Sequence, residues 1–128
     1  LGYATDIGHL TCDVKSALTG CENVVIESNY DPYMLKNGSY PYPIKQRILG
    51  ERGHLSNGEC ASFLPELVKN GTKNIVLAHL SVNNNKPHIA LGESRGALNS
   101  KGVSTCEELG RADVRLCTAM PDSIVEIL

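Results

Sequence analysis

Residues 74–80 (NIVLAHL) form an almost continuous apolar run that ends in a histidine and a leucine. Residues 23–28 (NVVIES) form a second run of this kind, ending in a glutamate and a serine. Short apolar runs of this length are typical of strands buried on both faces of a sheet. Outward from these two runs, the pattern predicts the end of a strand at residues 1–5 and two late strands, at residues 114–119 and 123–128.

Helix signals alternate with these strands. Thr11 is placed to cap a first helix, Ser56 forms a capping box with Glu59 at the start of a second, and Pro87 suits the first turn of a third. The second helix carries apolar residues on one face, namely Cys60, Phe63, Leu64 and Leu67. Between the two apolar runs, residues 29–42 are predicted as a loop or short helix and residues 43–49 as a helical turn. This alternation predicts an α/β layered domain with parallel pairing in the middle of the sheet.

Composition limits the classes of function. The chain has 128 residues, about one domain, and its formal net charge is −2. That charge excludes a strongly basic nucleic-acid binder that depends on net charge, but leaves a local basic patch open. No apolar run approaches the ~18 residues of a membrane span, so we expect no membrane partner. The five cysteines are odd in number and lack a CxxC motif, which predicts reduced thiols in a cytoplasmic protein.

Polar side chains recur where the predicted strands end. Asp6 follows the first strand, Glu27 ends the second, and His79 lies near the end of the third. His54 stands just before the second helix. The carboxyl ends of parallel strands form the ligand crevice of open α/β sheets. Asp, Glu and His side chains that converge there are ligands of divalent metals.

Each of these residues also has a plainer interpretation. A histidine in a strand is more often a hydrogen-bonded core residue than a ligand, and an aspartate after a strand is usually a turn former. Glu27 is the strongest single signal, because a carboxylate in a buried strand is costly without a partner. It therefore needs a cation, a histidine or a network of donors.

The motifs YATDIGH, VVIESNYD, RGHLSN and IVLAHLS occur in this order, and together they resemble the C-terminal half of a metallo-β-lactamase-fold hydrolase. Within that superfamily the chain is similar to the YycJ/WalJ group, which is related to ribonuclease Z and the small phosphodiesterases. The resemblance implies that residues 1–128 form a single unit. This unit would be half of an αββα sandwich, with a mixed sheet and helices packed on it.

The resemblance also implies a role for each site residue. Asp6 matches the aspartate that bridges two metals, and His79 matches the last metal-binding histidine. His54 matches the histidine that can donate a proton to the leaving oxygen, and Glu27 matches the acidic residue that orients it. The implied cofactors are two divalent ions, zinc or manganese, and the implied activity is phosphodiester hydrolysis by a cytoplasmic exonuclease acting on DNA or RNA.

The family's main ligand motif, HxHxDH, precedes this region in family members and is absent from this chain. Asp6 and His79 alone supply about one and a half ligands per metal, whereas a catalytic zinc has about three protein ligands. We therefore expect this chain alone to bind no dinuclear centre and to be inactive.

A basic segment lies close to His54. Lys45, Arg47 and Arg52 suit a phosphodiester backbone, and Tyr40 and Tyr42 just before them can stack on bases. A solvated basic loop explains the same pattern equally well.

Two alternative functions stay open at this point. One keeps the fold and replaces the nucleic acid by a small cyclic phosphodiester or another ester. The other is a non-enzymatic half-domain that self-associates through an exposed face of its sheet.

Overall fold

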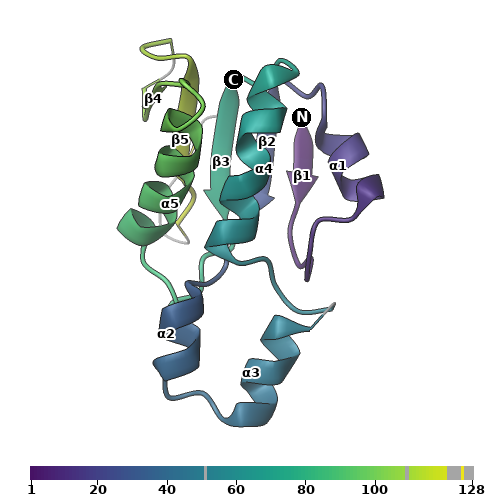
Figure 1. Cartoon of the computed structure of the whole chain (residues 1–128), viewed down its shortest axis with the longest axis vertical. Helices are drawn as coiled ribbons and strands as arrows, with labels where there is room; N and C mark the ends of the chain where they lie inside the picture. The colour runs from purple at the N-terminus through teal and green to yellow at the C-terminus, as the bar shows by residue number, and fades with distance from the viewer. Residues whose placement is uncertain (51, 109, 121–124, 126–128) are drawn as a thin grey trace.

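The computed structural model of the chain describes residues 1–50, 52–108, 110–120 and 125 (Figure 1). Among these residues, the centre is a five-stranded sheet in the order β1-β2-β3-β5-β4. Every pairing between these strands is parallel. The strands are β1 (Gly2–Ala4), β2 (Asn23–Glu27), β3 (Asn74–Ala78), β4 (Thr105–Cys106) and β5 (Val114–Thr118).

In the described part of the chain, five helices connect or flank these strands. Their N-termini follow the signals in the sequence: the Thr11 and Ser56 hydroxyls accept hydrogen bonds from Val14 and Glu59 N–H. Pro87 occupies the first turn of α5. The helices are α1 (Cys12–Leu18), α2 (Pro32–Asn37), α3 (Tyr42–Leu49), α4 (Asn57–Lys69) and α5 (Pro87–Asn99).

Helices α1, α4 and α5 cover one face of the sheet (Figure 1). Alternate strand residues such as Ile26, Ile75 and Leu77 point into this core and are fully buried. They meet the apolar face of α4, and the four residues predicted for that face are all buried. The opposite face carries a smaller apolar cluster made by Val25, Val76, Ala78 and Cys117, against which Ala119 and Val125 pack. The main core therefore lies between one sheet and one helical layer.

Helices α2 and α3 lie away from this layer. They stand beyond the end of the sheet toward which β1, β2 and β3 point (Figure 1). No residue of α3 is buried, so this helix adds nothing to the core. A polar contact joins the pair instead: the Lys45 amine donates to the carbonyls of Lys36 and Gly38, at 2.9 Å each. We call α2 and α3 together the α2–α3 hairpin.

The α/β class and the parallel pairing in the middle of the sheet are confirmed. The described strands are parallel throughout, whereas a mixed sheet was expected, and helical crossovers between successive central strands explain the parallel pairing. The strand expected at residues 123–128 lies outside the described residues, apart from Val125. The two-residue strand β4 was not predicted, because two residues are too few to show a periodic pattern. Residues 29–42 contain the short helix α2, capped by Asp31.

Gly53 closes the turn that leads from α3 to His54. A Cβ atom at Gly53 would lie 2.0 Å from the Ile48 carbonyl oxygen and 2.4 Å from that of Arg47. Backbone oxygens cannot move away as a flexible side chain can, so only glycine allows this close approach. The same Ile48 oxygen accepts a hydrogen bond from the N–H of His54 at 3.0 Å.

We predict that Gly53→Ala lowers the free energy of unfolding by about 1–3 kcal/mol, because the turn before His54 must open. Gly92→Ala is the matched control. Gly92 lies in α5, nothing would lie within 4 Å of its Cβ, and alanine favours a helix by up to about 1 kcal/mol over glycine. Urea-induced unfolding of both variants measures the difference. Equal stability of the two variants would contradict the tight turn.

Candidate metal and proton-transfer site

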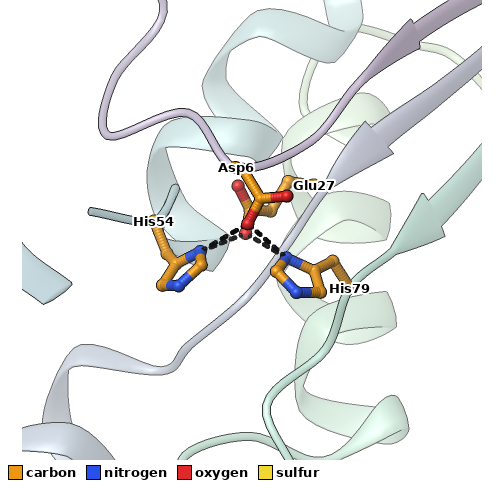
Figure 2. Close-up of side chains that lie close together, drawn as sticks. All are labelled: Asp6, Glu27, His54 and His79. Atoms are coloured by element: carbon orange, nitrogen blue, oxygen red, sulfur yellow. Dashed lines mark hydrogen bonds and ion pairs between the residues drawn. The ribbon is translucent and has the colours of Figure 1, made fainter. Parts of the chain in front are cut away.

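Four side chains converge at the carboxyl ends of β1, β2 and β3 (Figure 2). Asp6 follows β1, Glu27 is the last residue of β2, His79 follows β3 directly, and His54 comes from the turn before α4. Each offers a ligand atom, and these atoms lie within 4.8 Å of one another. Parallel pairing explains the convergence, since it sets Glu27 level with Ala78 and leaves all three strand ends at one edge.

The carboxylate of Glu27 joins the two histidines. Its Oε2 atom lies 2.7 Å from His54 Nδ1 and 2.7 Å from His79 Nδ1 (Figure 2). Its other oxygen, Oε1, accepts a hydrogen bond from the backbone N–H of Ile7 at 3.0 Å. The Glu27 side chain is 0% exposed. A buried carboxylate is costly unless donors surround it, and here three donors meet it.

These contacts determine which imidazole nitrogen faces outward. Because Nδ1 of each ring is directed at Glu27, each neutral ring carries its proton on Nδ1 and keeps the lone pair of Nε2. The rings are 5.0 Å apart between centroids and inclined by 66°. Side-chain exposure is 28% for His54 and 43% for His79, so both rings are accessible. Nε2 of each is thus the atom available for a metal or for proton transfer.

Asp6 completes the cluster from the solvent side. Its Oδ1 atom lies 3.8 Å from His54 Nδ1 and 3.7 Å from His79 Nδ1, and its side chain is 71% exposed. Asp6 and His79 are the two described non-glycine residues with positive φ, both at 57°. A left-handed backbone conformation is uncommon at non-glycine residues because it costs free energy, and such residues are found more often at functional sites. The residue types and the exposed carboxylate fit a divalent metal ion.

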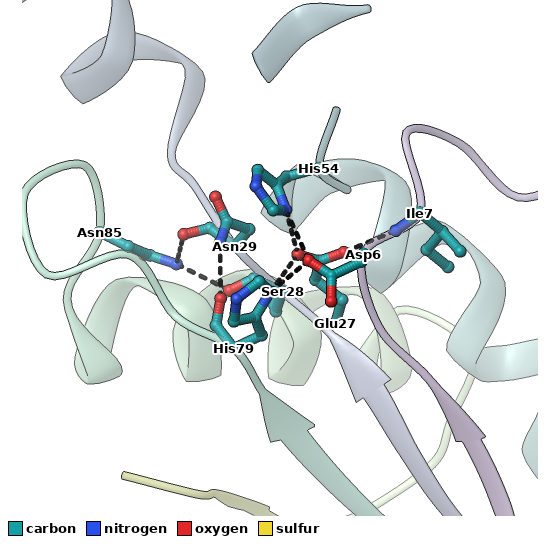
Figure 3. Close-up of polar contacts among 8 residues, drawn as sticks. All are labelled: Asp6, Ile7, Glu27, Ser28, Asn29, His54, His79 and Asn85. Carbon is teal, nitrogen blue, oxygen red and sulfur yellow. Dashed lines mark hydrogen bonds and ion pairs between the residues drawn. The ribbon is translucent and has the colours of Figure 1, made fainter. Parts of the chain in front are cut away.

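A buried amide network supports the His79 turn (Figure 3). The Asn29 amide donates to the His79 carbonyl oxygen at 2.6 Å. The Asn85 amide in turn donates to the carbonyls of Ser28 and Asn29, at 2.9 and 3.1 Å. Asn85 also exchanges two hydrogen bonds of 2.9 Å with Asn57, the first residue of α4. The network therefore ties the end of β2, the start of α4 and the loop before α5 to the backbone of a site histidine.

Sequence reasoning did not find Asn29, Asn57 or Asn85. Residues 83–85 are three consecutive asparagines before Lys86-Pro87, which is an ordinary loop composition. The usable signal was Asn29, a polar residue that follows the buried run of residues 23–28. Nothing in the sequence shows that Asn57 and Asn85 meet, since they are 28 residues apart.

The predicted basic residues divide into two groups. Arg47 and Arg52 are exposed, and no carboxylate of the described residues forms an ion pair with either of them. Lys45 is half-buried, with its amine hydrogen-bonded to two carbonyls of the α2–α3 hairpin. Of the tyrosines, Tyr42 is 72% exposed, while the hydroxyl of Tyr40 accepts a hydrogen bond from Asn83.

Cys60 lies in the core behind the site and has no chemistry to offer it. Burial, as the largest cause, raises the pKa of its thiol to about 12. The thiol is therefore protonated near neutral pH, and only a thiolate is a useful nucleophile or metal ligand. All five cysteines of the chain are free.

The chain is similar in sequence to two kinds of curated protein. The chain is 37% identical over 107 residues to "Exodeoxyribonuclease YycJ" of Bacillus anthracis, a match that covers 84% of this chain and 40% of that protein. The chain resembles the YycJ/WalJ exodeoxyribonucleases. It is also 38% identical over 86 residues to "Exodeoxyribonuclease WalJ" of Streptococcus pneumoniae, covering 67% of this chain and 32% of that protein. The sequence resemblance to this group is thus confirmed.

The chain spans less than half the length of these relatives. No family profile matches the chain, and no solved structure matches it significantly. Among the described residues, none of the helices combines the length and the apolar composition that crossing a bilayer requires.

We predict that Glu27→Gln disturbs the orientation of at least one of the two histidines. Three donors now bind the two carboxylate oxygens of Glu27, whereas a glutamine side chain has only one oxygen. At least one donor therefore loses its acceptor. In the unaltered chain, two-bond nitrogen–proton NMR spectra at pH 8 should show His54 and His79 as Nδ1–H tautomers. The variant should show mixed tautomers for at least one of them and lose about 1–3 kcal/mol of stability.

Glu22→Gln is the matched control, because Glu22 is exposed next to the start of β2. His9 and His88 are exposed and lie outside the site, so their signals serve as internal references. Unchanged tautomers of His54 and His79 in Glu27→Gln would show that the carboxylate does not orient them.

Proposed function

We propose that this chain carries part of the active site of a metal-dependent phosphodiester hydrolase, a nuclease that acts on DNA. The observation that carries the proposal is the buried Glu27 carboxylate, which holds His54 and His79 by Nδ1 beside Asp6. The curated names of the relatives support it, since both are exodeoxyribonucleases. The open edge of the site, with Asp6 71% exposed, suits a polymer better than a small cyclic phosphodiester.

Each residue has a distinct role in this proposal. Asp6 and His79 are metal ligands, through a carboxylate oxygen and Nε2. His54 uses Nε2 to donate a proton to the leaving oxygen, and Glu27 positions both rings and stabilises the positive charge of a protonated His54. A pair of divalent cations, zinc or manganese, would supply hydroxide near pH 7 and clamp the attacking and leaving oxygens when bound.

The count of ligands supports a division of the active site between two segments. Asp6 and His79 are too few for two cations that need about three protein ligands each. We propose that residues 1–128 form the C-terminal half of a metallo-β-lactamase domain and that the remaining ligands come from the other half. On this proposal the chain alone is inactive. The relatives, of which it covers 40% and 32%, have room for that half.

We further propose a cytoplasmic setting and local contact with the DNA backbone. Five free cysteines fit a reducing compartment. Arg47 and Arg52 are exposed and available to phosphates, whereas the amine of Lys45 holds the α2–α3 hairpin together and would reach a phosphate only by giving up those contacts. The alternative is a half-domain that self-associates through the helix-free face of its sheet. The metal measurement below would favour this alternative if it found a full complement of metal in the 128-residue chain.

We expect His54→Ala to lower turnover of a DNA substrate at least ~100-fold while leaving metal content almost unchanged, because general acid catalysis contributes ~10²–10⁴-fold. Asp6→Asn and His79→Ala should lower both turnover and metal content. The measurement is nuclease activity together with elemental analysis on the full gene product. His88→Ala, an exposed histidine on α5, is the control and should change neither. Equal loss of metal in all three site variants would show that His54 is a ligand instead.

We expect elemental analysis to find two equivalents of divalent metal in a protein that includes the upstream half, and almost none in the 128-residue chain. Chelation should abolish cleavage in the longer protein. Stoichiometric metal in the 128-residue chain would mean that a second copy completes the site.

A further inference from the structure

The α2–α3 hairpin contains a hollow of about 470 Å³ that the mechanism does not use. This volume is in the range of small-ligand sites. Apolar side chains make most of its wall, and two lysines belong to the lining. The hollow, which we call the hairpin groove, is lined by Pro32, Leu35, Lys36, Tyr42, Lys45, Gln46 and Leu49.

The groove keeps large apolar side chains in contact with water. Tyr42 is 72% exposed and Leu49 is 53% exposed, although both belong to a helix with no buried residue. Polar ties hold α3 in place instead of a core: Lys45 binds the end of α2, and the Ile48 carbonyl accepts from the N–H of His54. Leu35 of the wall is buried, whereas the part of the wall made by Tyr42 and Leu49 stays exposed in the described fold.

Both sides of the groove continue directly into the active site. On one side, Leu49 follows Ile48, whose carbonyl binds the backbone of His54. On the other side, Pro32 lies three residues after Asn29, whose amide binds the carbonyl of His79. A ligand that reaches from His54 along the hairpin therefore meets this groove.

The charge around the groove selects an anionic ligand. Lys36 lines the groove and is exposed. Arg47, within α3, and Arg52, in the turn before His54, are also exposed, but neither of them lines the groove. No ion pair within the described part of the chain involves these three side chains. An aromatic and aliphatic wall next to Lys36, which pairs with no carboxylate of the described residues, matches the two chemical parts of a nucleotide, the base and the phosphate.

We propose that the hairpin groove binds a nucleobase of single-stranded DNA, stacked on Tyr42 and packed against Leu49, with Lys36 facing the phosphates. The inference rests on the proposed nuclease function and specifies how its substrate is held. A base can enter such a groove only when it is unpaired, so the groove favours a single-stranded end. Stacking does not read base identity, and the binding is therefore tolerant of sequence.

The test is binding of a fluorescent 12-nucleotide oligothymidylate to the full gene product in EDTA, measured by anisotropy, which separates binding from cleavage. Tyr42→Ala and Leu49→Ala should each weaken binding by about ten-fold, the effect of losing one base contact. The same variants should bind an abasic oligonucleotide of equal length as the unaltered protein does. Tyr42→Phe keeps the ring and should keep the affinity.

Tyr33→Ala is the matched control. Tyr33 is 75% exposed on α2 and does not line the groove, so its loss should change neither affinity. Equal weakening of normal and abasic oligonucleotides by Tyr42→Ala, or no weakening, would overturn the groove proposal. Loss of folding or a changed oligomeric state in Tyr42→Ala, with Tyr42→Phe unaffected, would show a protein segment in the groove and would also overturn it.

The two proposals fail in different ways. If groove variants bind DNA normally while His54→Ala still abolishes its cleavage, only the groove proposal is wrong. If the unaltered protein neither binds nor cleaves DNA but hydrolyses bis(p-nitrophenyl) phosphate, the nuclease proposal is wrong and the groove proposal falls with it.

Discussion

The buried carboxylate of Glu27 is the constraint on which the site depends. A charge with no exposed surface is unfavourable unless donors surround it. The chain meets this requirement with the Ile7 N–H and with Nδ1 of His54 and His79. Since those donors come from three separate segments, satisfying one carboxylate brings the segments together. It also turns both Nε2 atoms outward, where the proposed chemistry needs them.

Hydrogen bonds around this carboxylate stabilise an unfavourable backbone conformation at His79. His79 has a positive φ, and its carbonyl accepts from Asn29, which is itself held by Asn85. Asn85 is 3% exposed and exchanges amide hydrogen bonds with Asn57 at the start of α4. Buried amide networks of this kind stabilise one arrangement because a partly satisfied alternative is costly. These hydrogen bonds thus connect the start of α4, which packs on the core, to the backbone of His79.

Much of this could be predicted from the sequence, for identifiable reasons. NVVIES and NIVLAHL are apolar because β2 and β3 are covered on both faces, and Glu27 stands out in that setting as a residue that needs partners. Ser56, Thr11 and Pro87 marked helix starts because capping is local chemistry. The amide network could not be predicted, because asparagines in loops are common and Asn57 and Asn85 meet only after folding. The role of the Lys45 amine could not be predicted either. Its hydrogen bonds to the carbonyls at the end of α2 form only in the folded chain, and no sequence pattern distinguishes Lys45 from a solvated lysine.

The sequence by itself determined the α/β class, the order of the central elements and the four residue types at the strand ends. Local periodicity and capping depend on near neighbours, which a sequence displays directly. Only the tertiary structure decided that one Glu27 oxygen binds both histidines and that Asp6 and His79 take left-handed conformations. Those features depend on contacts between residues 20 to 52 positions apart, and such contacts exist only once the sheet has set its parallel register.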